Sequence, residues 1–137
     1  MNYFKTSLFI LFSIVLFTSC REKEEDEGKL PGIAFKTGGD YISQNVSLSP
    51  GDTAHFGVNC YKTEDKDYLT RFDVSLSKDK EPFSSVFNKV LSGSEQSNYS
   101  FDSYLKMDTV AGLRQYRFTV TNRDGLINQL QVIVELK

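Results

Sequence analysis

Side chains that could perform acid–base or nucleophilic chemistry are sparse in this 137-residue sequence. His55 is the only histidine, so the sequence lacks the second imidazole of a catalytic pair or a histidine-rich metal cluster. The sequence also has no Gly-x-Ser-x-Gly elbow and no glycine-rich phosphate loop, the usual signatures of serine hydrolases and nucleotide-binding enzymes. We therefore predict a non-catalytic protein without a cofactor.

Two acidic segments are the candidates for a cation site. The first is Glu-Asp-Lys-Asp at 64–67, whose three carboxylates could supply part of the six to eight oxygen ligands that Ca²⁺ takes. The second is Asn-Arg-Asp-Gly at 122–125. The lysine within the first segment favours a solvated loop, so no metal site is predicted, and calcium binding at 64–67 is left open.

The N-terminal segment has the layout of a secretory signal. Lys5 precedes an apolar run at 7–17, and a Thr-Ser pair then leads to Cys20. This run is shorter than the roughly 20 apolar residues that a transmembrane helix needs. We therefore predict a signal peptide at 1–19.

The Phe-Thr-Ser-Cys stretch at 17–20 resembles the lipobox of bacterial lipoproteins, with Phe17 in place of the preferred leucine. In that family the cysteine receives a diacylglyceryl group and becomes the mature N-terminus. The resemblance implies that Cys20 is the lipid attachment site and that the membrane is a partner through this lipid. Several acyl chains on one residue, at about 0.8 kcal/mol per buried methylene, suffice for stable anchoring.

Cys20 begins a charged, solvated tether at 20–29, which contains no large apolar side chain. The Lys-Glu-Glu-Asp stretch at 23–26 is similar to the export signal that sends lipoproteins of the Bacteroidota to the outside of the outer membrane. The resemblance implies a lipid-anchored outer-membrane protein that faces the cell exterior.

Residues 30–137 alternate apolar and polar side chains in short runs, which is the period of β-strands. The clearest run, at 52–61, places Phe56 and Cys60 on the inner face and His55 on the outer face. The other runs lie at 32–36, 45–49, 70–77, 98–107, 115–121 and 128–136. The segment 84–91 fits either an irregular strand or a helical turn. Without a long amphipathic helix, this pattern predicts an all-β, immunoglobulin-like antiparallel β-sandwich of about seven strands as one domain, 30–137.

Two segments, 31–58 and 116–136, resemble immunoglobulin-like domains of Bacteroidota surface lipoproteins. The final hairpin matches such domains at Tyr116, Phe118, Val120 and Gly125. Asn122 stands where an acid is common. The resemblance implies the same sandwich architecture for the mature chain.

Cys60 is the second cysteine of the sequence, and a lipidated Cys20 leaves it without a disulfide partner. Antibody domains pair a cysteine on this strand with one at the position that Phe118 occupies here. We expect Cys60 to pack as a small core hydrophobe.

Two tripeptides match the Asp-Thr-aliphatic acceptor pattern of O-glycosylation in exported Bacteroidota proteins. They are Asp-Thr-Ala at 52–54 and Asp-Thr-Val at 108–110, so the resemblance makes Thr53 and Thr109 candidate modification sites. Both residues also suit the start of a strand beside a turn aspartate, which leaves a purely structural role open.

Composition narrows the choice of partners. The 16 basic and 18 acidic residues are nearly balanced, so nucleic acid is not an expected partner. A glycan reader would need aromatic rings in a flat row, and the candidates for that row are Tyr41, Tyr61, Tyr68, Tyr99 and Tyr104. The sequence has no Trp, which favours a protein partner.

We expect a lipid-anchored binding or adhesion module of the cell envelope, with an unknown protein or glycan partner and ligand-binding residues still unknown. One alternative is a structural accessory subunit of an outer-membrane or periplasmic envelope complex. The other alternative is an enzyme or an enzyme inhibitor.

Overall fold

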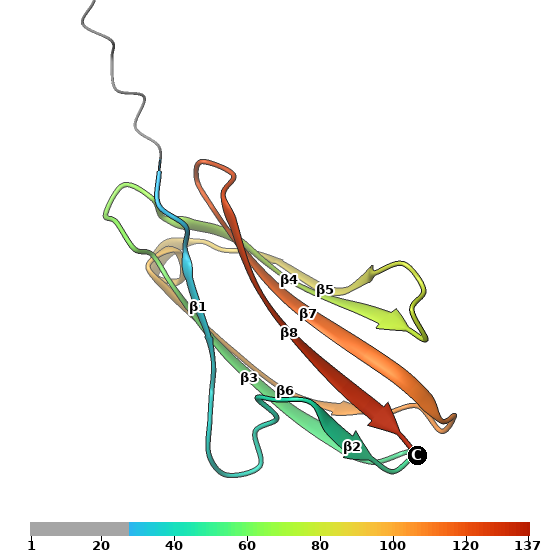
Figure 1. Cartoon of the computed structure of the whole chain (residues 1–137). Helices are drawn as coiled ribbons and strands as arrows, with labels where there is room; N and C mark the ends of the chain where they lie inside the picture. Colours follow the sequence, from blue (N-terminus) through green and yellow to red (C-terminus); the bar gives the residue numbers. More distant parts are fainter. Residues whose placement is uncertain (1–27) are drawn as a thin grey trace, which may run out of the picture.

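The computed structural model describes residues 28–137. The predicted signal peptide, Cys20 and most of the predicted tether lie outside the described residues. Two sheets pack face to face (Figure 1). The first has the order β1-β3-β6, with β1 at Gly32–Phe35, β3 at Thr53–Tyr61 and β6 at Asn98–Lys106. The second has the order β2-β8-β7-β4-β5, with β2 at Val46–Leu48, β4 at Leu69–Lys78, β5 at Ser84–Val90, β7 at Gly112–Asn122 and β8 at Ile127–Leu136.

The predicted all-β sandwich of two sheets is confirmed, and its eight strands exceed the expected seven or so by one. The sandwich is not wholly antiparallel, because β2 pairs with β8 in parallel. The ambiguous segment 84–91 forms the edge strand β5, and its side chains are almost all exposed, so it carried no alternating burial signal. Within residues 28–137, none of the helical structure is long and apolar enough to cross a membrane.

The core lies between the sheets and is dominated by phenylalanine rings. Phe118 of β7 is fully buried, and its ring centroid lies 5.6 Å from Phe56 of β3, 5.6 Å from Phe35 of β1 and 6.1 Å from Phe101 of β6. Cys60 also faces this core as a free cysteine, as expected, and burial raises the pKa of its thiol to about 12. The thiol therefore stays protonated and unreactive at neutral pH.

The predicted hairpin of β7 and β8 is confirmed, with Gly125 at φ +80° in its turn. Asn122 is buried there, and its Oδ1 accepts hydrogen bonds from the backbone N–H groups of Asp124 and Leu126. Its Nδ2 donates to the carbonyl oxygen of Lys29 at 3.0 Å. An aspartate could not donate this bond, which gives the asparagine at this position a structural reason.

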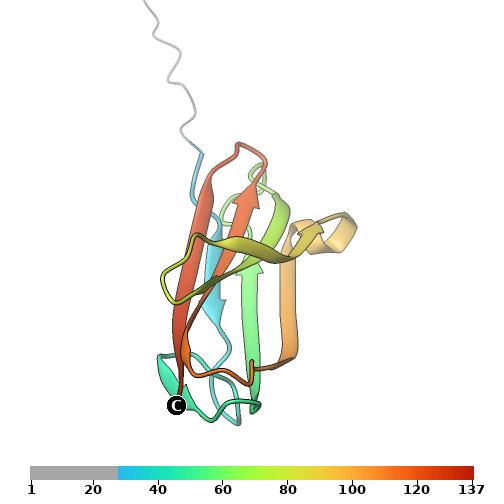
Figure 2. The same ribbon diagram turned by 90° about the vertical axis from the view of Figure 1, so that its right-hand side faces the viewer.

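The two sheets have unequal widths on the side where the chain crosses between them. β5 leads through a short 3₁₀ turn, η2 (Gly93–Gln96), to β6 in the other sheet (Figure 2). β4 faces β6, since the rings of Phe72 and Phe101 lie 5.2 Å apart. β6 is the last strand of the three-stranded sheet, whereas the five-stranded sheet continues past β4 to β5. Within residues 28–137, β5 therefore extends beyond β6 and has no strand opposite it.

Replacing Phe118 by Ala should lower the free energy of unfolding by about 3–5 kcal/mol, because it removes ring contacts with three other strands and leaves a cavity. Chemical denaturation would measure this loss. The matched control is Val110→Ala, since Val110 is 67% exposed and its truncation should change stability by less than about 0.5 kcal/mol. Equal effects of the two substitutions would contradict the central role of Phe118.

Candidate functional site

Polar and aromatic side chains gather around His55 on the outer face of the three-stranded sheet. The loop after β1 folds back over β3, where Ile42 N donates to the carbonyl oxygen of His55 at 2.8 Å. Gly38 and Gly39 at the turn of this loop have φ values of +90° and +57°, a conformation that favours glycine. The resulting His55 cluster consists of Lys36, Asp40, Tyr41, His55, Asp102 and Tyr104.

The imidazole of His55 is held on both faces and at both nitrogens. Its ring lies between Tyr104, at a centroid distance of 3.8 Å, and Tyr41, at 4.1 Å. Nδ1 lies 2.7 Å from Asp40 Oδ1, and Nε2 lies 2.7 Å from Asp102 Oδ1. Because an ionised carboxylate only accepts hydrogen bonds, this geometry favours the charged imidazolium, in which both ring nitrogens donate.

Electrostatics in the cluster favour the charged forms of its two bases and two acids, Lys36, His55, Asp40 and Asp102. Hydrogen bonding to Asp102, followed by that to Asp40, raises the pKa of His55 above its ordinary value. Hydrogen bonds from Lys36, Tyr41 and His55 hold the pKa of Asp102 well below its usual range. Two acids thus face two bases, and His55 has no free nitrogen to act as a general base or as a metal ligand.

His55 lies on the outer face, as predicted, but only 7% of its surface is exposed. The covering residues come from distant parts of the chain, with Asp40 15 residues and Asp102 47 residues away in sequence. Alternation within one strand carries no information about such cover, so sequence reasoning missed the cluster.

A groove of about 600 Å³ opens on the side of the sandwich where β5 extends beyond β6. We call it the β5–β6 groove. Its lining comes from β4, β5, β6 and the adjoining part of β7, and consists of Val74, Leu76, Val86, Phe87, residues 99–106, Asp108 and Tyr116. Most of these side chains are apolar or aromatic, which is typical of ligand pockets of this size.

The β5–β6 groove reaches solvent along both of its strands. Phe87 is 39% exposed and Val86 is 53% exposed, although both are large apolar residues. On the β6 side, every residue from 99 to 106 contributes, whichever way its side chain points, so the backbone edge of β6 is part of the lining. No sequence motif marks the groove, because it results from the unequal widths of the two sheets.

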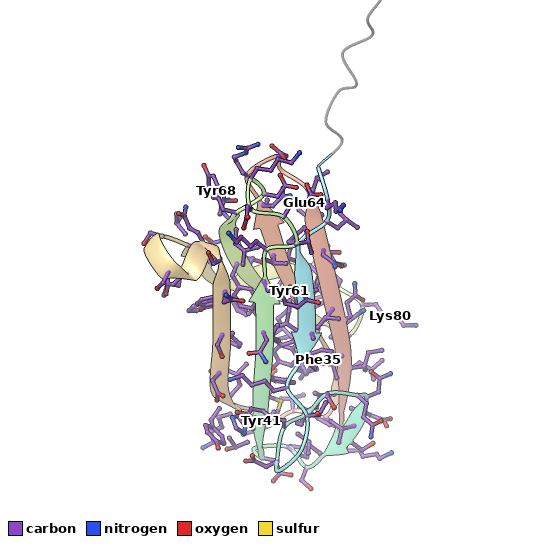
Figure 3. All side chains as sticks on the ribbon, turned by 90° about the vertical axis from the view of Figure 1, so that its left-hand side faces the viewer. Phe35, Tyr41, Tyr61, Glu64, Tyr68 and Lys80 are labelled. Atoms are coloured by element: carbon purple, nitrogen blue, oxygen red, sulfur yellow. The ribbon has the colours of Figure 1, made fainter. Side chains whose placement is uncertain are left out.

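The five tyrosines do not form a flat row for a glycan. Tyr41 and Tyr104 cover His55, whereas Tyr99 points into the sandwich and its ring lies 5.2 Å from Phe72. Tyr68 lies toward the opposite end of the domain from Tyr41, and Tyr61 lies between them, as Figure 3 shows. The five rings therefore do not form one row, and the choice between a glycan and a protein partner stays a prediction.

The acidic segment 64–67 directs its carboxylates to different partners. Glu64 pairs with the ammonium of Lys29 at 2.8 Å, and Asp65 pairs with Lys62 at 2.9 Å. Asp67 is buried, and its Oδ2 accepts a hydrogen bond from the backbone N–H of Lys29 at 3.0 Å. Within residues 28–137, no three His, Cys, Asp or Glu side chains are placed to hold a metal ion together.

Thr53 and Thr109 lie at the end of the domain opposite residue 28. Thr53 is the first residue of β3, Thr109 follows β6, and both are exposed. Their loops adjoin, since Gly51 N donates to the carbonyl oxygen of Asp108 at 2.9 Å. Modification of these two threonines remains a prediction.

Comparison with known proteins gives a distant likeness of fold. No protein-family model and no curated protein matches the chain. A superoxide reductase (neelaredoxin) from Ignicoccus hospitalis is 9% identical, with 80% of this chain and 81% of that chain covered and a TM-score of 0.48. A β-glucosidase from Listeria innocua is 13% identical over 77% of this chain and 16% of that chain, with a TM-score of 0.47. Spo0M, a sporulation control protein from Bacillus subtilis, is 12% identical over 78% and 49%, with a TM-score of 0.45. The chain is thus a small β-sandwich with distant structural likenesses, and its function is argued from its own residues.

The stability of the domain should fall as the pH rises through the raised pKa of His55. The contribution of the charged ring is fully present below about pH 6.5, the ordinary histidine pKa, and is lost as the folded protein deprotonates. Denaturation at several pH values between about 5.5 and 8 would measure this loss, below the range where Cys60 ionises in the unfolded chain. His55→Gln should be nearly independent of pH over this range, since His55 is the only histidine. Equal slopes for the two proteins would contradict the prediction.

Proposed function

We propose that the chain is a lipid-anchored binding module on the cell surface and that the β5–β6 groove is its ligand site. The observation that carries this proposal is the groove itself, an apolar cleft of about 600 Å³ bordered by the edge strands of both sheets. Its exposed residues Val86 and Phe87 are of the kind that a soluble domain normally covers. A bound partner would cover them.

The role is non-catalytic. His55 has both ring nitrogens bonded to carboxylates, and most side chains that line the β5–β6 groove are apolar or aromatic. Asp102 and Asp108, two acids that border the groove, already accept hydrogen bonds from Lys36 and Arg114 respectively. These contacts leave the groove suited to binding through burial of apolar surface.

The proposed lipid anchor would determine which end of the domain faces the membrane. The described chain begins at residue 28, at the end of the domain where Asp67 and Asn122 bind the backbone of Lys29. A lipid on Cys20 and the charged residues after it would hold this end of the sandwich toward the outer membrane. Thr53 and Thr109, the candidate glycosylation sites, would then face away from the membrane. The sandwich fits an immunoglobulin-like domain of the kind that Bacteroidota surface lipoproteins carry.

Surface display should be visible as protease sensitivity of intact host cells. Wild type should be digested on intact cells, whereas Cys20→Ala should leave the membrane fraction because it lacks the acylation site. A variant with the acidic tether replaced by Ser and Gly should stay membrane-bound and become protected, because its export signal is lost. Digestion of the wild type only after lysis would instead place the domain inside the envelope.

Peptide binding to the β5–β6 groove should depend on Phe87. The probe is a phage-displayed library of random nine-residue peptides, panned on the purified Cys20→Ala chain. Enriched peptides should bind Phe87→Ser about tenfold or more weakly, since the substitution removes an exposed aromatic side chain that the peptide would bury. The matched control is Ile127→Ser, an exposed apolar residue outside the groove lining, which should bind as wild type does. Failure to enrich any peptide, or equal binding to both variants, would contradict the proposed site.

A further inference from the structure

We propose that the occupant of the β5–β6 groove is an extended segment of a partner protein, which adds to the three-stranded sheet as a strand along the free edge of β6. Every second side chain of this segment is apolar and points into the groove. The inference rests on the proposed function and specifies the class of ligand and its mode of binding. Edge strands commonly bind extended peptides in this way, because their unpaired backbone groups supply the hydrogen bonds.

Backbone geometry identifies which groups of β6 are available. Met107 N donates to Asp52 O at 2.8 Å, and Lys62 N donates to Ser97 O at 3.0 Å. The backbone groups of these two odd-numbered residues, which flank β6, therefore point toward β3 and its flanking residues. Antiparallel pairs alternate between bonded and non-bonded, and the pairing of β3 with β6 continues without a register shift. The N–H and C=O groups of the even-numbered residues therefore point away from β3. They belong to Ser100, Asp102, Tyr104 and Lys106, and within residues 28–137 β6 pairs only with β3.

The β5–β6 groove lies where the inner side chains of an added strand would go. A fourth strand beside β6 would lie beneath β5, which extends beyond β6. Its inward side chains would then meet Val86 and Phe87 of β5 and Leu76 of β4, which now line the groove. Because side chains alternate along a strand, one residue in two would be apolar.

The other strand edges suit an added strand less well. The remaining edge strands are short, with four residues in β1 and three in β2. β5 has a register shift in its pairing with β4 between Val74 and Ser75, and such bulges protect edges against further pairing. β6 offers nine residues in regular register.

A second copy of this chain fits the space poorly. In each copy β4 already lies over β6, with the rings of Phe72 and Phe101 5.2 Å apart. If the β6 strands of two copies paired edge to edge, the β5 of the first copy would lie over the β6 of the second copy. That position is already occupied by the second copy's own β4, so the two strands would collide. The space beneath β5 takes a single strand that brings no second layer with it, which is an extended segment.

The test combines an enriched peptide with backbone-resolved measurements on the Cys20→Ala chain. Binding should slow hydrogen exchange at the amides of Ser100, Asp102 and Tyr104 by about tenfold or more, while the amides of Phe101 and Ser103 already bond to β3 and should change little. Two versions of the peptide are compared, one N-methylated at every odd position and one at every even position. The version whose methyl groups replace the N–H groups that face β6 should bind about tenfold or more weakly, and the other should bind as the unmodified peptide does. The two methylated peptides have identical side chains and serve as controls for each other.

Three outcomes would overturn strand addition. The first is a peptide whose binding depends on Phe87 but leaves the β6 amides unprotected. This result would support the groove as the ligand site and contradict the addition of a strand. The second is equal binding of both N-methylated series. The third is protection of the same amides at high protein concentration without any peptide, accompanied by dimerisation in sedimentation, which would assign the edge to a second copy. Loss of dependence on Phe87 would instead remove the proposed function.

Discussion

Contact between phenylalanine rings of the two sheets holds this sandwich together. A disulfide between the sheets is not available within residues 28–137, since their one cysteine is a free, buried thiol. The ring contacts form a continuous series from Phe35 of β1 through Phe118 and Phe101 to Phe87 of β5. Phe118 is fully buried, whereas Phe87, the last member, is 39% exposed. The packing that builds the core thus continues to the surface at the β5–β6 groove, so the proposed ligand site is a continuation of the core.

Sequence reasoning succeeded where one strand carries its own signal. Alternation along 52–61 and the Asp-Gly turn at 124–125 predicted β3 and the final hairpin, because burial on one face and turn geometry are local properties. The edge strand β5 has little burial to alternate, so its type stayed ambiguous. The His55 cluster and the groove were missed, because each arises from segments that only the sheet order brings together.

Asp102 connects the His55 cluster with the β5–β6 groove. Its side chain accepts hydrogen bonds from Lys36, Tyr41 and His55 on the outer face, while its backbone lies on the free edge of β6. Three donors on one carboxylate restrict the motion of this part of the strand. An edge that is already ordered loses less conformational entropy when a ligand binds, so the cluster favours binding without touching the ligand's side chains.

The antiparallel order β1-β3-β6 also determines how the domain would carry a mechanical load. The chain enters β1 at Gly32, beside Tyr61 at the end of β3, and β6 lies on the other side of β3. A pull between residue 28 and a strand bound along β6 runs parallel to the strand axes. The hydrogen bonds of each ladder then share the force at once in shear, instead of opening one after another as in a zipper. If the domain is tethered at this end as proposed, it would resist detachment of its ligand along the whole length of its smaller sheet.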